Sequence, residues 1–235
     1  MKLAEQTVLG LEGSGFAISV GIMGKGEARG LIYLNEGSPG SEILLATIDQ
    51  LLATLRMSRH ELEGICVTLG PGSFTSLRIS LAVAESLGLG LGLPVYGVDT
   101  LQLIAATVPY YADRIKVIQN AYKGEYYAAT YVTREGRPQR LDDLHIIKPA
   151  KFYEQLAPGD LLLGTGVSHL LQKGYDLAAK QVRWNLDFQR TVSGIGVIEH
   201  FLDEEAREPS LKPLEPIYIR PSEAEINYKK QFGSG

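Results

Sequence analysis

The spacing of hydrophobic residues changes along the first 70 positions from strand-like runs to a helical period. Three short apolar runs joined by glycine-containing links predict an antiparallel meander. Apolar side chains in residues 41–57 recur at helical spacing with Ser41 as N-cap, and Ser58 with Glu61 predicts a capped turn after them. The run GICVTLG, residues 64–70, lacks polar alternation and predicts a strand covered on both faces. The three predicted meander strands are residues 7–14, 16–23 and 28–35.

The segment LGPGSFTSLRIS, residues 69–80, places two glycines and a proline directly before a hydroxyl-rich run. A phosphate-binding loop needs several free backbone N–H groups and usually a lysine. Pro71 has no N–H, no Gly-Lys-Ser/Thr follows, and the glycines do not match the dinucleotide motif G-x-G-x-x-G. We therefore interpret the segment as a turn that begins a helix near Ser73, whose start could hold an anion only weakly; a strand is predicted at 94–98. The residues of this structural motif are Gly70, Pro71, Gly72, Ser73, Phe74, Thr75 and Arg78.

One face of that helix carries little side-chain bulk. Small residues recur at every fourth position from Ser76, and a neighbouring row consists of Ala82, Ser86 and Gly90. Such rows let another helix approach closely, and two alternatives stay open: a helix of a partner, or an element of the same chain. On the first alternative, Ala84→Trp leaves the fold intact and abolishes partner binding. The predicted interface residues are Ser76, Ser80, Leu81, Ala84 and Gly88.

The apolar run from Ile79 to Val98 carries a single charge, Glu85, and is about as long as a bilayer is thick. A carboxylate near its middle costs about 2.5 to 3.5 kcal/mol on insertion, and glycines together with Pro94 interrupt the run. We therefore expect a buried helix followed by a strand, and no membrane span.

From about Tyr111 onward, strands joined by polar turns are followed by short helices around a buried strand at 160–164. Four prolines in residues 209–221 predict an extended arm packed on the body. We expect two domains, residues 1–108 with the dimerisation helix, and a smaller, divergent domain at 109–235. The internal likeness we find is a loose one, between LGLEGSG and LLGTGVS. Helices are predicted at 149–156, 167–175 and 192–206.

Composition excludes several classes of protein. With a net charge of -4 and a pI near 5.6, the chain is not expected to hold a polyanion by charge alone. A single cysteine, Cys66, excludes an internal disulfide and a multi-thiolate metal site. The first apolar run is too short for a signal peptide, so a cytoplasmic protein is expected. The four histidines are not at metal-ligand spacing and no G-x-S-x-G is present, so we expect no metal site and no nucleophile elbow.

Three polar residues are candidates for a role beyond solvation. Glu12 and Ser14 lie at the end of the first predicted strand, where actin-like kinases carry a metal-steering carboxylate, and they are the candidate nucleotide contacts. The alternative is that Glu12 is merely solvated. Arg78 lies one turn into its helix, where the helix dipole does not favour a cation. We expect Arg78 to bind a carboxylate or a carbonyl as a structural tie.

The segment GPGSFTSLRISLAVAESLGLGLGLPVYGVDTL resembles the signature of the bacterial TsaB family, also called YeaZ. The stretches NAYKGEYYAATY and PIYIRPSEAE are similar to two further family motifs. The resemblance implies an actin-like (ASKHA, ribonuclease-H-like) two-subdomain α/β fold with mixed β-sheets. The order of the predicted elements fits that fold, although by itself it supports only a mixed α/β sheet. The chain departs from the usual family pattern at Glu12, Gly13, Ser76 and Asn120, and around Gly40.

The resemblance also implies a function. Family members are non-catalytic subunits that bind a TsaD-type catalytic subunit. With a TsaE-type ATPase they support threonylcarbamoyl transfer to the tRNA adenosine next to the anticodon. The implied subunit forms a homodimer when alone and contacts tRNA only through the complex. It has no cofactor of its own, and ATP or ADP would be bound only at an interface of the complex. The alternatives are a stand-alone actin-like ATPase or small-molecule kinase, and a peptidase.

Overall fold

The computed structural model describes residues 5–15, 17–35, 40–121, 123–186, 192–203, 214–217 and 219. Its first sheet has the strand order β3-β2-β1-β4-β5. The meander is antiparallel, β4 pairs parallel with β1, and β5 pairs parallel with β4. The predicted meander, the strand at 64–70 and the strand at 94–98 are thereby confirmed. The strands are β1 (Thr7–Glu12), β2 (Ile18–Gly24), β3 (Glu27–Leu34), β4 (Gly64–Gly70) and β5 (Val95–Asp99).

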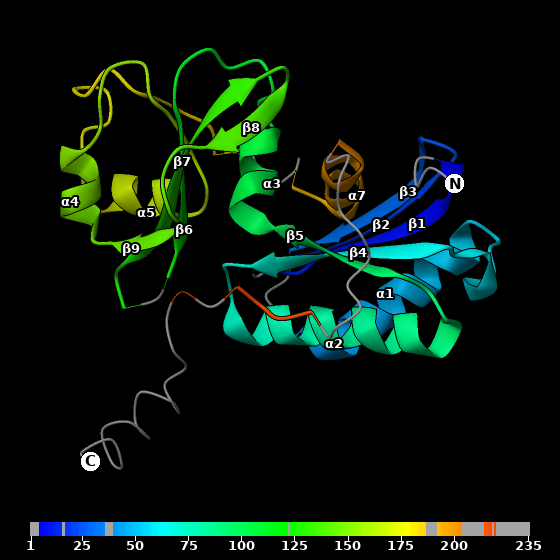
Figure 1. The fold of residues 1–235 in the computed structure, drawn as a ribbon. Helices are drawn as coiled ribbons and strands as arrows, with labels where there is room; N and C mark the ends of the chain where they lie inside the picture. The colour runs from blue at the N-terminus through cyan, green and yellow to red at the C-terminus, as the bar shows by residue number, and fades with distance from the viewer. Residues whose placement is uncertain are drawn as a thin grey trace, which may run out of the picture.

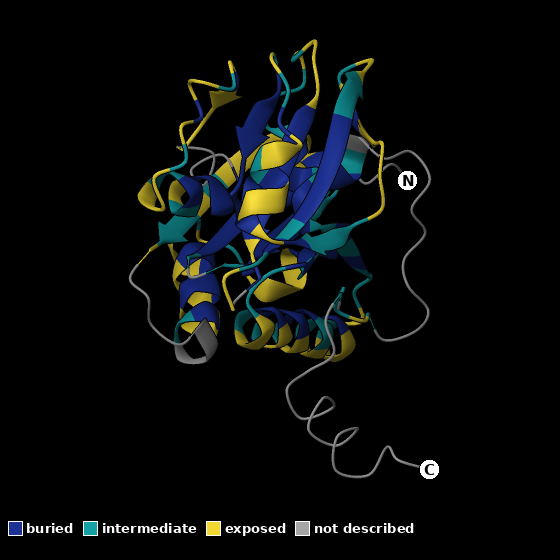
Figure 2. Ribbon diagram, turned by 90° about the vertical axis from the view of Figure 1, so that its left-hand side faces the viewer, coloured by how far each residue is buried: buried dark blue, intermediate teal, exposed yellow. Residues whose placement is uncertain are grey.

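Helices cover both faces of this sheet, as Figure 1 shows. On one face lie α1 (Gly40–Thr54) and α2 (Phe74–Leu91), and on the other lies α7 (Gly194–Asp203). Alternate residues of β1 therefore enter different cores: Leu9 packs with the side chains beneath α1 and α2, and Val8 with those beneath α7. Figure 2 shows the resulting buried strands in dark blue. The short helix η2 (Arg59–Glu61) carries the predicted capping box of Ser58 and Glu61.

The second sheet repeats the topology of the first. Its order β8-β7-β6-β10-β11 corresponds to β3-β2-β1-β4-β5, with the same parallel and antiparallel neighbours. A further strand, β9, pairs antiparallel with β7. The elements are β6 (Ile115–Asn120), β7 (Tyr126–Arg134), β8 (Arg137–Arg140), β9 (His145–Ile147), α4 (Pro149–Glu154), β10 (Leu161–Leu163), α5 (Gly166–Gln172) and β11 (Arg183–Trp184).

This repeat corrects the loose internal likeness found in the sequence. LLGTGVS begins at the end of β10, the counterpart of β4, so its structural equivalent is the LGPGS segment that begins at the end of β4 and not LGLEGSG. In both segments the first glycine has a positive φ, +100° at Gly70 and +105° at Gly164. That backbone conformation favours glycine, and in each case it precedes the turn into a helix. The two sheets therefore use the same strand–turn–helix connection at the same place.

The last described parts of the chain return to the first sheet. Helix α7, which lies within the predicted helix 192–206, packs on β1, β2 and β4 although the predicted division assigns it to the second domain. In the predicted arm, residues 214–217 form no helix and contact α2 and the end of β4. The Ile217 N–H donates to the Leu69 carbonyl at 2.8 Å, and the Leu214 N–H to Glu85 Oε1 at 2.7 Å. The rest of the arm and residues 204–206 lie outside the described residues.

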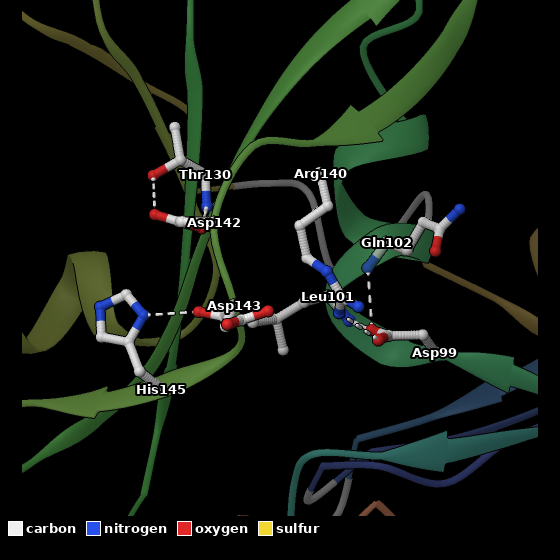
Figure 3. Close-up of polar contacts among 8 residues, drawn as sticks. All are labelled: Asp99, Leu101, Gln102, Thr130, Arg140, Asp142, Asp143 and His145. Carbon is white, nitrogen blue, oxygen red and sulfur yellow. Dashed lines mark hydrogen bonds and ion pairs between the residues drawn. The ribbon is translucent and has the colours of Figure 1, made fainter.

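Helix α3 (Thr100–Ala106) joins the two sheets through its N-terminal cap, shown in Figure 3. Asp99 Oδ1 accepts hydrogen bonds from the Leu101 and Gln102 N–H groups at 2.8 and 3.1 Å. Asp99 Oδ2 lies 3.3 Å from the Arg140 guanidinium, which belongs to the second sheet. A shared hydrophobic core continues this connection, because Leu101 and Ile104 pack in the same cluster as Ile115 and Tyr131.

Asp99→Ala is expected to lower the free energy of unfolding by about 1 to 2 kcal/mol, because it removes an N-cap as well as an ion pair. Arg140→Ala should cost less than about 1 kcal/mol, since the Arg140 side chain is 41% exposed and its ion pair is screened by water. Urea unfolding of both variants measures the difference. Equal losses would show that the cap contributes nothing beyond the ion pair.

The α2 segment has the length and mean hydropathy, 1.2 over 18 residues, of a helix that could cross a membrane. In the fold one side of α2 packs against β4 and α1. The helix ends at Gly92, which has a positive φ, and β5 follows within the first sheet. The helix and the strand are both observed, but the helix is buried on one side only, with 28% of the segment buried. Its contacts with β4 and α1 favour a helix of the folded domain over a membrane span.

Candidate functional site: the cleft between the sheets and the outer face of α2

The carboxyl-terminal ends of β1 and β6 open onto a cavity of about 450 Å³, called the cleft below. β1 and β6 occupy the same place in their sheets, and residues at the end of each strand line the cleft. The start of α2 and the start of α5 supply further residues in the same way. The cleft is lined by Glu12, Ser14, Gly15, Ala17, Tyr33, Asn35, Gly72, Ser73, Gln119, Asn120, Gly124, Glu125, Thr165, His169 and Val192.

Glu12, at the end of β1, is only 5% exposed although it lines the cleft. Its Oε1 accepts hydrogen bonds from the Ser14 N–H at 2.9 Å and from the Ser14 hydroxyl at 2.5 Å. Burial nevertheless raises the pKa of the Glu12 carboxyl, because desolvation disfavours its charged form by more than these two bonds favour it. The two candidate contacts predicted from the sequence, Glu12 and Ser14, thus lie together in the cleft.

The second sheet contributes polar residues that the sequence analysis did not identify. Gln119 Oε1 accepts hydrogen bonds from the Thr165 N–H at 3.0 Å and from the Thr165 hydroxyl at 2.5 Å. His169 Nδ1 lies 2.8 Å from the Tyr126 hydroxyl, and burial together with Lys173 lowers the pKa of His169, which favours a neutral ring. The turn that follows β4 recurs after β10, and this repeat is the signal that could have located these residues.

The described residues that line the cleft do not fit a nucleotide, although the actin-like fold implies one between the two sheets. They include two acids, Glu12 and Glu125, and no lysine or arginine. The Ser73 N–H, at the start of α2, already donates to the Ser14 carbonyl at 2.7 Å. A Cβ on Gly72 would overlap that same Ser14 carbonyl oxygen, so the turn is packed against the β1 loop. A phosphate bound here would face the carboxylates of Glu12 and Glu125, and these lining residues include no cation to balance its charge.

Glu12→Gln is expected to stabilise the protein near neutral pH. In the folded protein the Glu12 carboxyl keeps its proton to a higher pH than in the unfolded chain, where its pKa is 4.5. The stability of the wild-type protein therefore falls as the pH rises above 4.5 and through the pKa of the folded state. A glutamine keeps an oxygen for Ser14 and has no charge to desolvate, so the unfolding temperature should rise by roughly a few degrees at about pH 8 and by less at about pH 4. A variant less stable than wild type at both pH values would contradict this.

Helix α2 presents its predicted interface row to its own sheet, which corrects the prediction of a partner contact there. Ser80, Leu81, Ala84 and Gly88 are buried, and Ala84 is 0% exposed. A Cβ on Gly13 would overlap Ser80 Oγ, and one on Gly88 would overlap a Val95 methyl group. The small side chains therefore allow α2 to lie close to the β1 loop and β5. Ser76 is half-buried and its hydroxyl donates to Ser73 Oγ at 3.0 Å.

The opposite side of α2 is exposed and is called the outer face below. It contains the second small-residue row from the sequence analysis, flanked by Arg78 and Leu89, and Leu89 is 88% exposed. The Arg78 guanidinium carbon lies 4.0 Å from the centroid of the Phe74 ring, a cation–π contact at one end of this face. The polar partner expected for Arg78 stays a prediction. The outer face consists of Phe74, Arg78, Ala82, Ser86, Leu89 and Gly90.

Comparison with known proteins identifies the family. A family model described as "TsaD: tRNA N6-adenosine threonylcarbamoyltransferase" matches residues 40–204. A Bacillus subtilis relative named "tRNA threonylcarbamoyladenosine biosynthesis protein TsaB" is 25% identical over 227 residues, which cover 94% of this chain and 97% of the relative. The chain belongs to the family that this model describes, and the relatives that it matches over nearly their whole length are named TsaB. An Escherichia coli TsaB relative is 32% identical over 129 residues, covering 52% of this chain and 56% of that protein.

Two solved structures, one named YeaZ and one described as similar to YeaZ, share the fold. A Pseudomonas aeruginosa structure, described as an uncharacterized protein with similarity to peptidase YeaZ, aligns with a TM-score of 0.68 at 22% identity. The alignment covers 92% of this chain and all of that one. A second structure, YeaZ from Pseudomonas aeruginosa, has a TM-score of 0.64 and 21% identity, and covers 83% of this chain and 91% of its own. The predicted actin-like, mixed α/β fold is confirmed.

Proposed function

We propose that this TsaB-family chain is a non-catalytic subunit in the formation of N6-threonylcarbamoyladenosine next to the anticodon of tRNA. In this role it binds and activates a TsaD-type catalytic subunit, together with a TsaE-type ATPase. The observation that carries the proposal is the match to relatives named for this biosynthesis along nearly their whole length. The TsaD family model matching residues 40–204 supports a homologous catalytic partner.

The outer face of α2 is the surface best suited to such a partner. Ala82, Ser86 and Gly90 are exposed small residues at four-residue spacing, so a partner helix could approach the backbone of α2 closely. Phe74 and Leu89 add apolar contact at its two ends. The same face would join two copies of the chain when the partner is missing, so homodimer and complex would exclude one another.

Several features favour a subunit without its own chemistry. The described residues of the cleft supply neither lysine nor arginine for a nucleotide, and no described group of three His, Cys, Asp or Glu side chains is arranged to hold a metal ion. The net charge of -4 favours contact with tRNA through the complex over direct binding. From this role in tRNA modification we propose that the protein acts in the cytoplasm.

Affinity purification from the native cell tests the partnership. The tagged chain is expected to recover a TsaD homologue in stoichiometric amount. Recovery of the tagged chain alone, with no TsaD homologue even after crosslinking, would contradict the proposal.

Measurement of ATP turnover tests the catalytic alternative. The purified chain alone should hydrolyse no ATP above the buffer rate. A metal-dependent turnover that Glu12→Ala abolishes would instead support a stand-alone ATPase or kinase.

A further inference from the structure

Two nearly buried side chains line the cleft with one polar atom of each left without a hydrogen bond among the described residues. Glu12 is 5% exposed and Gln119 is 7% exposed. Both recorded hydrogen bonds to Glu12 end at Oε1, and both recorded bonds to Gln119 end at its Oε1. Because the Thr165 N–H can only donate, it fixes which end of the Gln119 amide is oxygen. Glu12 Oε2 and the Gln119 NH₂ group are therefore available to a ligand.

The charge of the cleft selects the kind of ligand. Its described lining includes Glu12 and Glu125, a His169 ring whose neutral form is favoured, and no lysine or arginine. The other polar groups there are the hydroxyls of residues such as Ser73 and Tyr33 and the amides of Asn35 and Asn120. Hydroxyls and amides bind ligands of either sign, so the carboxylates set the preference. Burial alone disfavours the charged form of the Glu12 carboxyl, and a bound cation would favour that form, so the site can offer a cation an attraction that it cannot offer an anion.

We propose that the cleft binds a small organic cation, an ammonium or guanidinium compound, whose N–H groups donate to Glu12 Oε2. An acceptor atom on the same molecule would accept a hydrogen bond from the NH₂ group of Gln119, which the second sheet contributes to the cleft. The volume of about 450 Å³ lies in the range of small-molecule sites and admits a compound of the size of a diamine or an amino acid. This inference is independent of the proposed function, because it concerns the cleft and not the outer face of α2.

Thermal unfolding of the full chain with agmatine, which carries both an ammonium and a guanidinium group, tests this site. Agmatine is expected to raise the unfolding temperature saturably, beyond sodium chloride at the same ionic strength. Glu12→Gln should abolish this rise, or shift its half-saturation at least tenfold to higher concentration. The matched control, Glu27→Gln, removes an exposed carboxylate outside the cleft and should respond like wild type.

The outcomes separate the alternatives. No saturable rise with agmatine, or an equal rise in wild type and Glu12→Gln, would overturn the proposal. So would a rise with ATP, with or without Mg²⁺, that Glu12→Gln abolishes, because the cleft would then be a nucleotide site. Since Glu12→Gln is itself expected to be more stable than wild type near neutral pH, a lost response cannot be attributed to unfolding. Isothermal titration calorimetry with agmatine provides a second measurement that does not depend on stability. None of these results bears on TsaD binding.

Discussion

Ala84→Trp is expected to disrupt the first sheet, whereas Ala82→Trp, two residues earlier on the same helix, is expected to leave the protein folded. Ala84 is 0% exposed and packs in the cluster that contains Leu9 and Leu52. An indole there must push α2 away from the sheet, a cost of about 3 kcal/mol or more. Ala82 is exposed, so its tryptophan extends into solvent. Circular dichroism melts measure the difference, and equal stability of the two variants would contradict the observed orientation of α2.

The folded variant then tests the outer face. Ala82→Trp should weaken recovery of the TsaD-type subunit at least tenfold, because an indole holds two closely packed helices apart. Glu27→Gln, outside α2, serves as the control and should bind normally. If Ala82→Trp binds the partner as well as wild type does, the contact surface lies elsewhere on the molecule.

Gly10→Ala is expected to displace α7 from the first sheet and to cost several kcal/mol. A Cβ on Gly10 would overlap the carbonyl oxygen of Gly194, and one on Gly21 would lie 2.6 Å from the Ile195 backbone nitrogen. These contacts involve backbone on both sides, so no side chain can rotate away to relieve them. Displacement of α7 would also expose Ile198 and Phe201, which are buried in the core between the sheets.

The matched control is Gly90→Ala, on the outer face of α2. Among the described residues, no heavy atom outside the neighbouring backbone of α2 lies within 4 Å of the added Cβ, and alanine is a better helix former than glycine. The control is expected to raise the free energy of unfolding by about 0.5 to 1 kcal/mol. Urea unfolding of both variants should therefore give changes of opposite sign. A Gly10→Ala protein as stable as wild type would show that α7 is not seated as described.

Periodicity sufficed to predict the first sheet but not the orientation of α2. The strands β1 and β4 were identifiable because each is a short apolar run ended by glycine. By contrast, α2 has two small-residue rows, one through Ala84 and one through Ala82, and either could have faced the sheet. The choice depends on how Gly13 and Val95 approach the helix, which is a tertiary contact without a local sequence signal.

The cleft was only half predictable for a similar reason. Glu12 can be identified from the sequence because it is an acid at the end of an apolar strand. Gln119 and Thr165 are 46 positions apart and belong to no local motif, so their hydrogen bonds could not be read from spacing. The repeated turn after β10 is the feature that connects them to the better-recognised turn after β4, and it becomes evident only once the strand order is known.

The most direct test of the proposed function is the amount of N6-threonylcarbamoyladenosine in tRNA, measured by mass spectrometry after depletion of this chain from its native cell. After depletion the modification is expected to fall. The wild-type chain should restore it, and Ala82→Trp should not, although this variant is folded. An unchanged level of the modification after complete depletion would contradict a role of this chain in its formation.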